Sequence, residues 1–419
     1  MYTEIKKCRI CGNTDLVSIL HLGDQYLTGV FPKTKEETIT SGPIELLKCQ
    51  EDKKGNFCGL LQLRQSYDLN EMYGVNYGYR SSLNRSMVEH LRSKVNSLCQ
   101  RIALNKDDVV VDIGSSDGTM LSFYPRDAQV LIGFDPSAEK FRKCYRGDIH
   151  LITDFFSAKN YREKFGNETK AKIVTSIAMF YDLENPIEFM QQIETILAED
   201  GIWHFEQSYL PSMLEQNAYD TICHEHLEYY AVKQIKWMTD RAGLKILDIK
   251  LNAINGGSFA VTTAKQCAPY PENNKIIDKF LEQEQRIGLD TLTPYIAFKE
   301  RIFQHRSDLV KKLRQIRNDG KMIVGYGAST KGNVLLQFCG LDETLISCIA
   351  EVNKNKFGCF TVGTNIPIVS ESEAKVLNPD YLFVLPWHFK KNIIERESEY
   401  LNNGGKLLFP LPKIEEVEK

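Results

Sequence analysis

A ten-residue segment in the middle of the chain, TICHEHLEYY (residues 221–230), contains two histidines, two glutamates and a cysteine. Histidine has an unperturbed pKa of about 6.5, so a neutral imidazole can accept a proton near neutral pH. In an extended segment His224 and His226 lie on one face and Glu225 on the other, whereas in a helix the two histidines diverge. A neighbouring carboxylate, Glu225 or Glu228, can fix the tautomer of a histidine. The segment therefore predicts proton transfer, with buried, hydrogen-bonding histidines as the alternative.

Four of the eleven cysteines lie in the first 58 residues. Cys8 and Cys11 are separated by two residues, which lets both sulfurs of a tight turn bind one ion with Zn–S bonds of about 2.3 Å. Cys49 and Cys58 supply a second pair, although the eight residues between them exceed the usual spacing. The pattern predicts one structural Zn²⁺ bound by Cys8, Cys11, Cys49 and Cys58, with plain burial of the four thiols as the alternative.

The stretch VVVDIGSSDGTML (residues 109–121) is an apolar run followed by small residues. It predicts a buried parallel strand, a tight loop and the N-terminus of a helix, and the alternation of strands and helices continues as in a doubly wound sheet. About twenty residues later Asp135 ends a second apolar run, where a carboxylate can bind a ribose diol. Because Ser116 replaces the middle glycine of G-x-G-x-x-G, the loop favours S-adenosylmethionine over a dinucleotide without excluding the latter. The predicted cofactor contacts are Asp112, Gly114, Ser116, Asp117, Gly118, Asp135, Asp154, Phe155 and Ser176.

The last third of the chain repeats the pattern of strand, small-residue loop and helix. A long amphipathic helix is predicted from about residue 290 to Gly320, and GYGASTKGNVLLQFCG (residues 325–340) follows. Backbone N–H groups of such a loop, together with the ammonium of Lys331, suit a phosphate group. The loop lacks the full P-loop spacing, so a solvated surface lysine is the alternative. We predict a second α/β domain.

Length and composition limit the remaining possibilities. A chain of 419 residues predicts two or three domains, which we place at residues 1–72, 73–264 and 265–419. A net charge of −3 gives no basic field for nucleic acid. The sequence contains no apolar run long enough to cross a membrane and no secretory leader, so we expect a cytoplasmic protein. We expect a monomer or a weak homodimer.

Eight segments, taken in order, carry a resemblance to a known family: CRICG with CGLLQL, NYGYRSSLNRS, VDIGSSDGTML, YDTICHEHLEYY, NGGSFAV, GYGASTKGNVLLQFCG, IPI and VLPWHF. The chain resembles the sugar C-methyltransferases that use S-adenosylmethionine and act on nucleoside-diphosphate 4-keto-deoxysugars in branched deoxysugar biosynthesis. The resemblance implies an α/β protein with a zinc-binding N-terminal domain, a central Rossmann-like methyltransferase domain and a C-terminal Rossmann-like domain. It also implies that the sugar nucleotide lies between domains.

The resemblance further implies roles for single residues. His226 is the expected base or proton relay, with Glu225 and His224 as neighbours. Tyr77 and Tyr79 are expected to reach the sugar. The diphosphate is expected near Lys331 and Asn333, and the zinc ligands carry over to Cys8, Cys11, Cys49 and Cys58.

Two departures from the family pattern bear on the proton path. Cys223 stands where the family commonly has a tyrosine, and SIAMFYDLENP (residues 176–186) lacks the family's histidine. The hydroxyl of Tyr181 is a possible substitute. The expected reaction is deprotonation of carbon 3 of a nucleoside-diphosphate 4-keto-6-deoxyhexose, followed by methylation of the enolate. The alternatives are O- or N-methylation of a sugar or small metabolite, a sugar-nucleotide oxidoreductase using NAD(P), and a zinc-assisted RNA modification protein, which the acidic balance disfavours.

Overall fold

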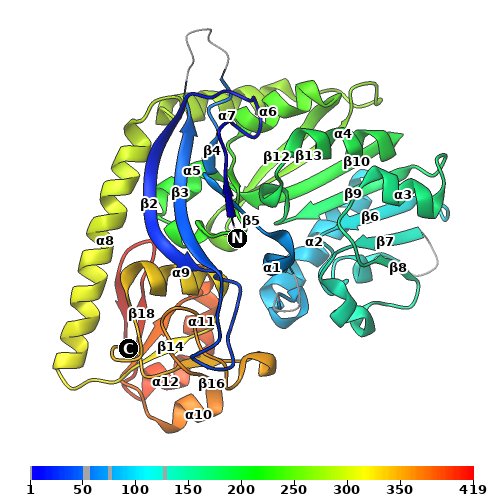
Figure 1. The fold of residues 1–419 in the computed structure, drawn as a ribbon. Coiled ribbons are helices and arrows are strands. Elements are labelled where there is room, and N and C mark those ends of the chain that lie inside the picture. The colour runs from blue at the N-terminus through cyan, green and yellow to red at the C-terminus, as the bar shows by residue number, and fades with distance from the viewer. Residues whose placement is uncertain (1, 51–56, 74–77, 126–129) are drawn as a thin grey trace.

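The computed structural model describes residues 2–50, 57–73, 78–125 and 130–419 (Figure 1). In this part of the chain the strands form a four-stranded, a seven-stranded and a six-stranded sheet, and a short two-stranded pair. In Figure 1 the N-terminal strands (blue) run beside both α/β units, which are coloured cyan to green and yellow to red.

The central sheet has seven strands in the order β12-β13-β10-β9-β6-β7-β8. They are β6 (Val109–Ile113), β7 (Val130–Phe134), β8 (Ile149–Ile152), β9 (Ala171–Ile177), β10 (Leu197–Ser208), β12 (Leu244–Asn252) and β13 (Ser258–Lys265). β13 runs antiparallel to β10 and β12, and the other described pairs are parallel. Every residue of β6 is buried, as expected for a strand covered on both faces.

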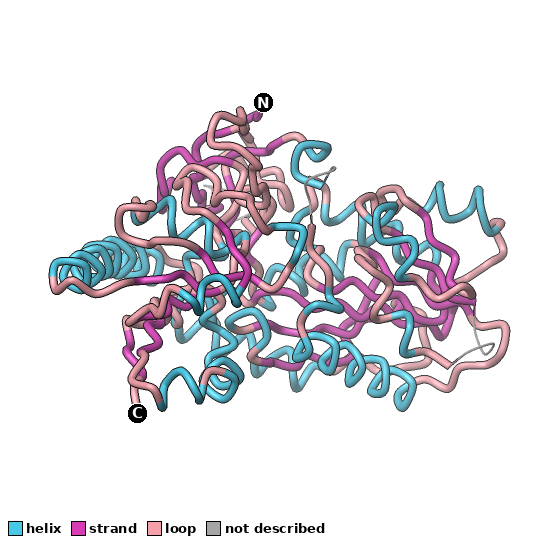
Figure 2. The backbone as a smooth tube through the Cα atoms, turned by 90° about the horizontal axis from the view of Figure 1, so that it is seen from below, coloured by secondary structure: helices cyan, strands magenta, loops and turns pink. Residues whose placement is uncertain are grey.

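Helices lie on both sides of this central sheet (Figure 2). The helices in this part of the chain are α2 (Arg85–Arg101), α3 (Ala158–Phe165), α4 (Pro186–Ile196), α5 (Leu210–Glu215) and α6 (Val232–Arg241). The chain order reverses between β6 and β9, because β7 and β8 extend the sheet on one side and β10 on the other. Ligands of such sheets bind at the carboxyl ends of the strands beside this reversal. The glycine loop after β6 therefore lies where a cofactor is expected, and the predicted doubly wound sheet is confirmed.

The expectation of a helix directly after this loop is wrong. Within the described residues 114–125 the loop leads into a single 3-10 turn, Leu121–Phe123. Tyr124 is extended, with φ −70° and ψ 148°. A residue before proline is disfavoured in helical geometry, so Pro125 ends the turn before an α-helix can form.

The C-terminal sheet has the order β16-β15-β14-β17-β18-β19, and β19 is its antiparallel edge strand. Its strands are β14 (Ile323–Tyr326), β15 (Ile349–Glu351), β16 (Ile368–Ser370), β17 (Tyr381–Val384), β18 (Lys406–Phe409) and β19 (Glu415–Val417). The chain order reverses between β14 and β17, which makes a second binding edge. The helices are α9 (Thr330–Cys339), α10 (Glu371–Val376), α11 (Lys390–Arg396) and α12 (Ser398–Asn402). The predicted second α/β domain is confirmed, as is the long helix before it, α8 (Thr293–Asn318).

The N-terminal sheet has the order β11-β4-β3-β2. Its strands are β2 (Leu16–Tyr26), β3 (Ser41–Cys49), β4 (Leu61–Leu63) and β11 (Glu228–Tyr229), while β1 (Tyr2–Glu4) pairs with β5 (Gln65–Tyr67) and α1 (Leu69–Tyr73) follows. Two elements cross the expected domain borders. β11 comes from the central part of the chain, and α7 (Asn274–Ile287) packs against α6 and β12 of the central unit.

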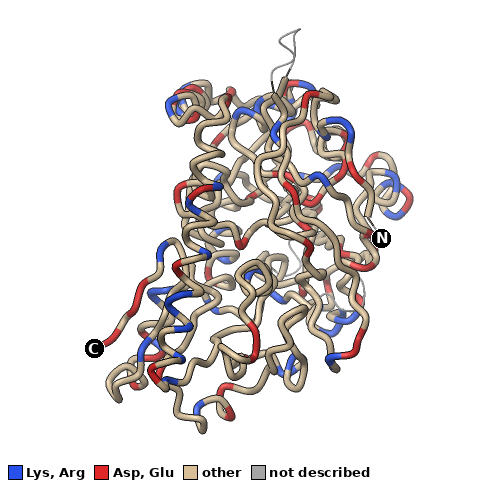
Figure 3. The backbone as a smooth tube through the Cα atoms, turned by 60° about the vertical axis from the view of Figure 1, so that its left-hand side comes forward, with Lys and Arg blue, Asp and Glu red and all other residues tan. Residues whose placement is uncertain are grey.

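Charged residues of both signs are intermixed along the chain (Figure 3). No helix of the described residues is both long enough and apolar enough to cross a lipid bilayer.

Candidate active site and metal centre

The four N-terminal cysteines meet at one end of the N-terminal sheet. Their sulfurs all lie within 4.8 Å of one another, with 3.4 Å between Cys8 and Cys58 and 3.5 Å between Cys11 and Cys49. All four are free thiols. A tetrahedral Zn²⁺ with Zn–S bonds of about 2.3 Å separates its sulfurs by about 3.8 Å. The structure therefore brings the four predicted ligands together in a cluster that fits the ion.

Glycines shape both cysteine turns. Gly12 has φ +71°, and its N–H donates to the carbonyl of Cys8 at 2.9 Å. Gly59, directly after Cys58, has φ +72°. Left-handed geometry favours glycine because a Cβ atom crowds the backbone there, which explains why each turn carries one.

The histidine-rich segment forms a turn at Cys223–His226, where the N–H of His226 donates to the carbonyl of Cys223 at 3.2 Å. The extended geometry considered for this segment is therefore wrong, and its two histidines have different surroundings. His224 is fully buried, with Nε2 3.1 Å from the carbonyl of Gln25 and its ring edge-on to Tyr67 at 4.6 Å. His224 thus contacts the N-terminal sheet.

His226 is partly exposed, whereas the other nine residues of 221–230 are buried. Its Nδ1 lies 2.7 Å from the carbonyl oxygen of Thr221. A carbonyl only accepts, so Nδ1 carries the hydrogen and Nε2 keeps a lone pair. The tautomer is therefore set by a backbone carbonyl and not by Glu225 or Glu228. Burial, together with the nearby ammonium of Lys331, lowers the pKa of His226 to about 3, so the imidazole is neutral at physiological pH.

The carboxyl groups near this turn are buried. Thr28 Oγ1 donates to Glu225 Oε2 at 3.4 Å, and burial raises the pKa of Glu225. Burial also raises the pKa of Asp182 and of Glu228 well above the usual range. The ring of Tyr181, next to Asp182, lies 4.3 Å from the His226 ring. The turn is thus surrounded by groups whose neutral forms are favoured.

The glycine loop has the geometry of a cofactor loop. Gly114, Ser116 and Gly118 all have left-handed backbone, with φ of +76°, +51° and +75°. Asp135 holds the loop because its Oδ2 accepts a hydrogen bond from the N–H of Ser116 at 2.8 Å. A Cβ atom on Gly118 would lie 2.8 Å from the ring of Tyr145. These glycines keep the loop close to the sheet edge, which fits S-adenosylmethionine between the loop and Asp135.

The other predicted cofactor residues divide into two groups. Asp112 and Ser176 face the core: Asp112 accepts a 2.6 Å hydrogen bond from Thr175, and Ser176 accepts one of 3.1 Å from the indole of Trp203. The remaining three surround the loop or the end of β8, as follows. Asp117 accepts from the N–H of Ser82 at 3.1 Å, Asp154 accepts from the N–H of Phe155 at 2.8 Å, and the Phe155 ring is 42% exposed.

Tyr77 lies outside the described residues. Tyr79 lies beside the glycine loop, where its carbonyl accepts a hydrogen bond from Ser116 Oγ at 3.3 Å and its side chain is 48% exposed. The structure thus brings Tyr79 to the cofactor edge of the central sheet.

Lys331 and Asn333, both on α9, have different surroundings. Lys331 Nζ donates to the carbonyl of Asn255 at 2.8 Å, and its charge acts on His226. Asn333 is buried, and its amide donates to the carbonyl of Thr28 at 2.8 Å. Asn333 therefore joins the C-terminal unit to the N-terminal one, and Lys331 lies near enough to His226 to act on its charge.

Sequence reasoning missed His388 and the pair Asp220–Trp387. Trp387 Nε1 donates to Asp220 Oδ2 at 2.7 Å, which connects the residue before the histidine-rich segment to the C-terminal sheet. Burial, together with the charge of Lys331, lowers the pKa of His388 to about 3. Both C-terminal residues directly follow the strand β17 and Pro386, at the sheet's second binding edge. The sequence could have indicated these residues, because VLPWHF stands at the end of an apolar run, where a buried strand ends.

Glu351 is the acidic residue that ends β15 in the C-terminal unit. In a dinucleotide-binding fold such a carboxylate binds ribose. Here one oxygen accepts from the N–H of Ala328 at 2.9 Å, and the other accepts from Val352 and Asn353 at 2.7 and 2.8 Å. Glu351 thus holds the loop after β14 as Asp135 holds the loop after β6, and its bonding does not distinguish the two cofactors.

Three family models match the chain in the order of its three parts. Residues 8–73 match a "Putative zinc binding domain", residues 87–249 a "Methyltransferase domain" and residues 253–412 a "C-methyltransferase C-terminal domain". The C-methyltransferase NovU of Streptomyces niveus is 29% identical over 411 residues, which cover 98% of this chain and 96% of that protein.

Solved structures resemble less than half of the chain. An S-adenosylmethionine-dependent methyltransferase from Clostridium acetobutylicum has a TM-score of 0.34 and 13% identity, covering 42% of this chain and 92% of its own. The plantazolicin methyltransferase BpumL, solved with SAH, has a TM-score of 0.34 and 15% identity, covering 44% of this chain and 87% of its own. Scores of this size add nothing to the fold described above.

The sheet order, the glycine loop and the matched models define an S-adenosylmethionine-dependent methyltransferase with a zinc-binding N-terminal domain. The match to a C-methyltransferase extends over nearly the whole chain and includes the C-terminal model, which supports C-methyltransferase activity, and the chain is similar to the C-methyltransferases that its motifs resemble.

Proposed function

We propose that this enzyme removes the proton from carbon 3 of a nucleoside-diphosphate 4-keto-6-deoxyhexose and transfers a methyl group to that carbon. The observation that carries the proposal is the position of neutral His226 between two binding edges. Tyr181, which contacts its ring, follows β9 at the cofactor edge. Lys331, which acts on its charge, belongs to α9 at the C-terminal edge. A base between a methyl donor and a phosphate-anchored ketone is what carbon methylation requires.

The chemistry assigned to the chain is proton transfer. His226 Nε2 accepts the C3 proton, the electrons of the broken C–H bond form an enolate with the C4 carbonyl, and the C3 carbon becomes the nucleophile. S-adenosylmethionine, when bound, supplies an electrophilic methyl group. The low pKa of His226 favours loss of the proton afterwards, and the residue is partly exposed to solvent.

Two further side chains are assigned to the substrate. The Tyr181 hydroxyl is proposed to hydrogen-bond the C4 oxygen as it gains negative charge, in place of the family's tyrosine at position 223. Lys331 is proposed to bind the diphosphate, with His388 beside it. Charge on the phosphates suits an ammonium that lies at the carboxyl edge of a parallel sheet.

The test is product analysis. The enzyme is incubated with ¹³C-methyl-labelled S-adenosylmethionine and a panel of nucleoside-diphosphate 4-keto-6-deoxyhexoses, and products are examined by mass spectrometry and NMR. We expect the label on a carbon that has lost its proton. The matched 4-hydroxy sugar nucleotides should remain unmethylated, because their C3–H is not acidified. A label bound to oxygen or nitrogen, or methylation of the 4-hydroxy sugars, contradicts the proposal.

A further inference from the structure

The two cysteine pairs both adjoin the short strand β4 (Leu61–Leu63). Cys58 lies three residues before the start of β4, and the N–H of Cys49 donates to the carbonyl of Leu60 at 2.8 Å. Arg9, between the first two cysteines, donates through Nη1 to the carbonyl of Leu63 at 2.5 Å. Its own N–H donates to Gln62 Oε1 at 3.1 Å. The metal-binding turns therefore hold β4 from both sides.

β4 in turn holds the segment that carries the proposed base. It pairs with β11, which begins two residues after His226. The N–H of Leu63 donates to the carbonyl of Leu227 at 2.8 Å, and the N–H of Leu227 donates to the carbonyl of Tyr181 at 2.9 Å. The residue after the base is thus bonded on one side to the zinc-binding domain and on the other to Tyr181.

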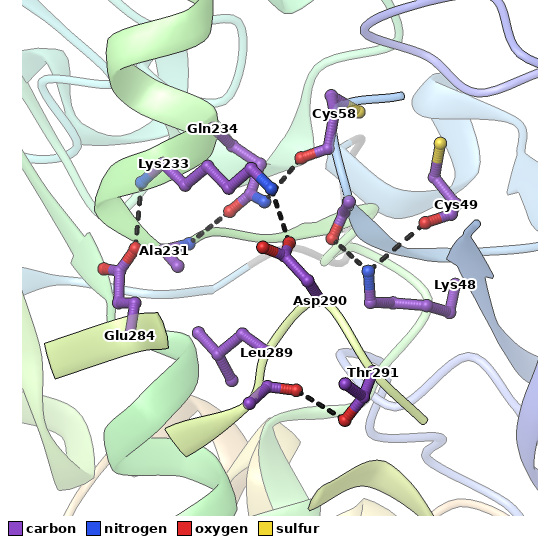
Figure 4. Close-up of polar contacts among 12 residues, drawn as sticks. Lys48, Cys49, Cys58, Ala231, Lys233, Gln234, Glu284, Leu289, Asp290 and Thr291 are labelled. Carbon is purple, nitrogen blue, oxygen red and sulfur yellow. Dashed lines mark hydrogen bonds and ion pairs between the residues drawn. The ribbon is translucent and has the colours of Figure 1, made fainter. Parts of the chain in front are cut away.

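A second connection runs from the cysteines to α6 (Figure 4). Gln234 Nε2 donates to the carbonyl of Cys58 at 2.8 Å, and Gln234 Oε1 accepts from the N–H of Ala231 at 2.9 Å. Lys48 Nζ, which is buried, donates to the carbonyl of Gly59 at 2.8 Å and that of Cys49 at 3.2 Å. The start of α6, which follows β11, is therefore fixed to the same turns.

We propose that the zinc-binding turns position the catalytic turn, with Arg9 as a positioning residue that transmits the geometry of the metal site through β4 to His226 and Tyr181. The inference rests on the proposed function of His226. A zinc ion that only stabilises its own domain would not affect the reaction. Under this inference, zinc binding also sets the rate of proton abstraction. The cofactor loop after β6 has no part in this chain of contacts, so its binding of S-adenosylmethionine is expected to be independent of it.

The Arg9 side chain is 2% exposed, and it also contacts Glu184 at 3.0 Å and Glu228 at 3.8 Å. Arg9→Met keeps much of its volume and leaves the four thiols in place. We expect this variant to retain one equivalent of zinc and the wild-type Kd for S-adenosylmethionine, while C3 proton exchange falls at least tenfold, as for a misplaced base. Arg9→Lys, which keeps one donor, should recover part of the rate. The control is Arg64→Met, because Arg64 directly follows β4 and is paired with Glu45 of β3 at 2.7 Å, on the side of β4 away from β11.

Hydrogen–deuterium exchange of the wild-type protein tests the same inference without substrate. Zinc is withdrawn by a chelator under reducing conditions, with the metal content measured. We expect peptides covering 57–63 and 221–231 to lose protection while the peptide covering 109–121 keeps it. Retained protection at 221–231, or equal loss at 109–121, overturns the inference. So does an Arg9→Met variant with wild-type exchange at C3. If the wild-type enzyme exchanges no C3 proton, the proposed function fails, and the deuterium pattern still reports on the contacts separately.

Discussion

Two properties of His226 bear on its role: its Nδ1 is held by a hydrogen bond, and its pKa is low. The carbonyl of Thr221 accepts a hydrogen bond from Nδ1. Burial and the charge of Lys331 lower the pKa of the imidazole to about 3. Residue types and their spacing predicted proton transfer in this segment. They did not predict the tautomer or the charge state, because a backbone carbonyl has no signature in the sequence and Lys331 is more than a hundred positions away.

The charge state of His226 predicts the pH dependence of kcat/KM, which reports the free enzyme. A histidine with lowered pKa stays neutral as the pH falls through 6.5, so kcat/KM should stay level between about pH 8 and about pH 5. An ordinary histidine base would lose half of the activity near pH 6.5. Lys331→Met removes a charge that lowers the pKa of His226. In this variant the fall of kcat/KM on the acid side should therefore occur at higher pH than in the wild-type enzyme. If kcat/KM of the wild-type enzyme falls by half near pH 6.5, His226 does not have the lowered pKa.

Tyr181 contacts the base from the central unit, and its substitution separates positioning from oxyanion stabilisation. Tyr181→Phe keeps the ring contact of 4.3 Å and removes the hydroxyl. We expect kcat to fall about 10²-fold, as when one oxyanion donor is lost, with the Kd for S-adenosylmethionine unchanged. Tyr270→Phe is the control, since that hydroxyl bonds the carbonyl of Asp200 at the other end of β10. If Tyr181→Phe keeps the wild-type kcat, a group other than the Tyr181 hydroxyl stabilises the oxyanion.

At the scale of elements, the loop after β6 illustrates what sequence patterns can predict. The strand, the loop and the acidic residue after β7 were all expected and found, because buried strands and glycine turns leave local signals. The helix after the loop was not found, since Pro125 stops it as a 3-10 turn. The pairing of β4 with β11 joins segments more than 160 positions apart, and a two-residue strand carries no periodicity from which such pairing can be read.

Gly118 tests the loop. Its φ of +75° and the 2.8 Å approach of Tyr145 leave no room for a side chain. Gly118→Ala should therefore strain the loop by about 1 to 3 kcal/mol and weaken S-adenosylmethionine binding about tenfold or more. Gly147→Ala is the control because no atom lies near its Cβ position. Calorimetric titration measures both, and an unchanged Kd in Gly118→Ala would show that the loop does not hold the cofactor.

At the scale of the whole molecule, all three sheets contact residues 220–229, which include the proposed base His226. The N-terminal sheet contacts this segment through β11, the central unit through Tyr181, and the C-terminal unit through Lys331 and through Trp387. The three domains and their order could be predicted from motifs along the chain. Their mutual contacts could not, because each depends on backbone atoms and on one or two side chains from distant segments.

The bond between Trp387 and Asp220 tests these contacts. Trp387→Phe leaves the buried carboxyl without its donor at 2.7 Å, a loss of about 1 to 3 kcal/mol. We expect KM for the sugar nucleotide to rise about 5- to 150-fold, because the C-terminal edge loses its fixed position, while the Kd for S-adenosylmethionine stays unchanged. Steady-state kinetics with both ligands measure the difference. Equal changes for the two ligands would point to general destabilisation.

Carbon deprotonation by His226 is tested most directly by solvent exchange without a methyl donor. The enzyme is mixed with a nucleoside-diphosphate 4-keto-6-deoxyhexose in D2O, and deuterium at C3 is followed by NMR. Wild-type protein should introduce deuterium at C3, and His226→Asn should slow this by about 10²-fold or more. Exchange at the wild-type rate in His226→Asn, or none in the wild-type enzyme, would contradict the account.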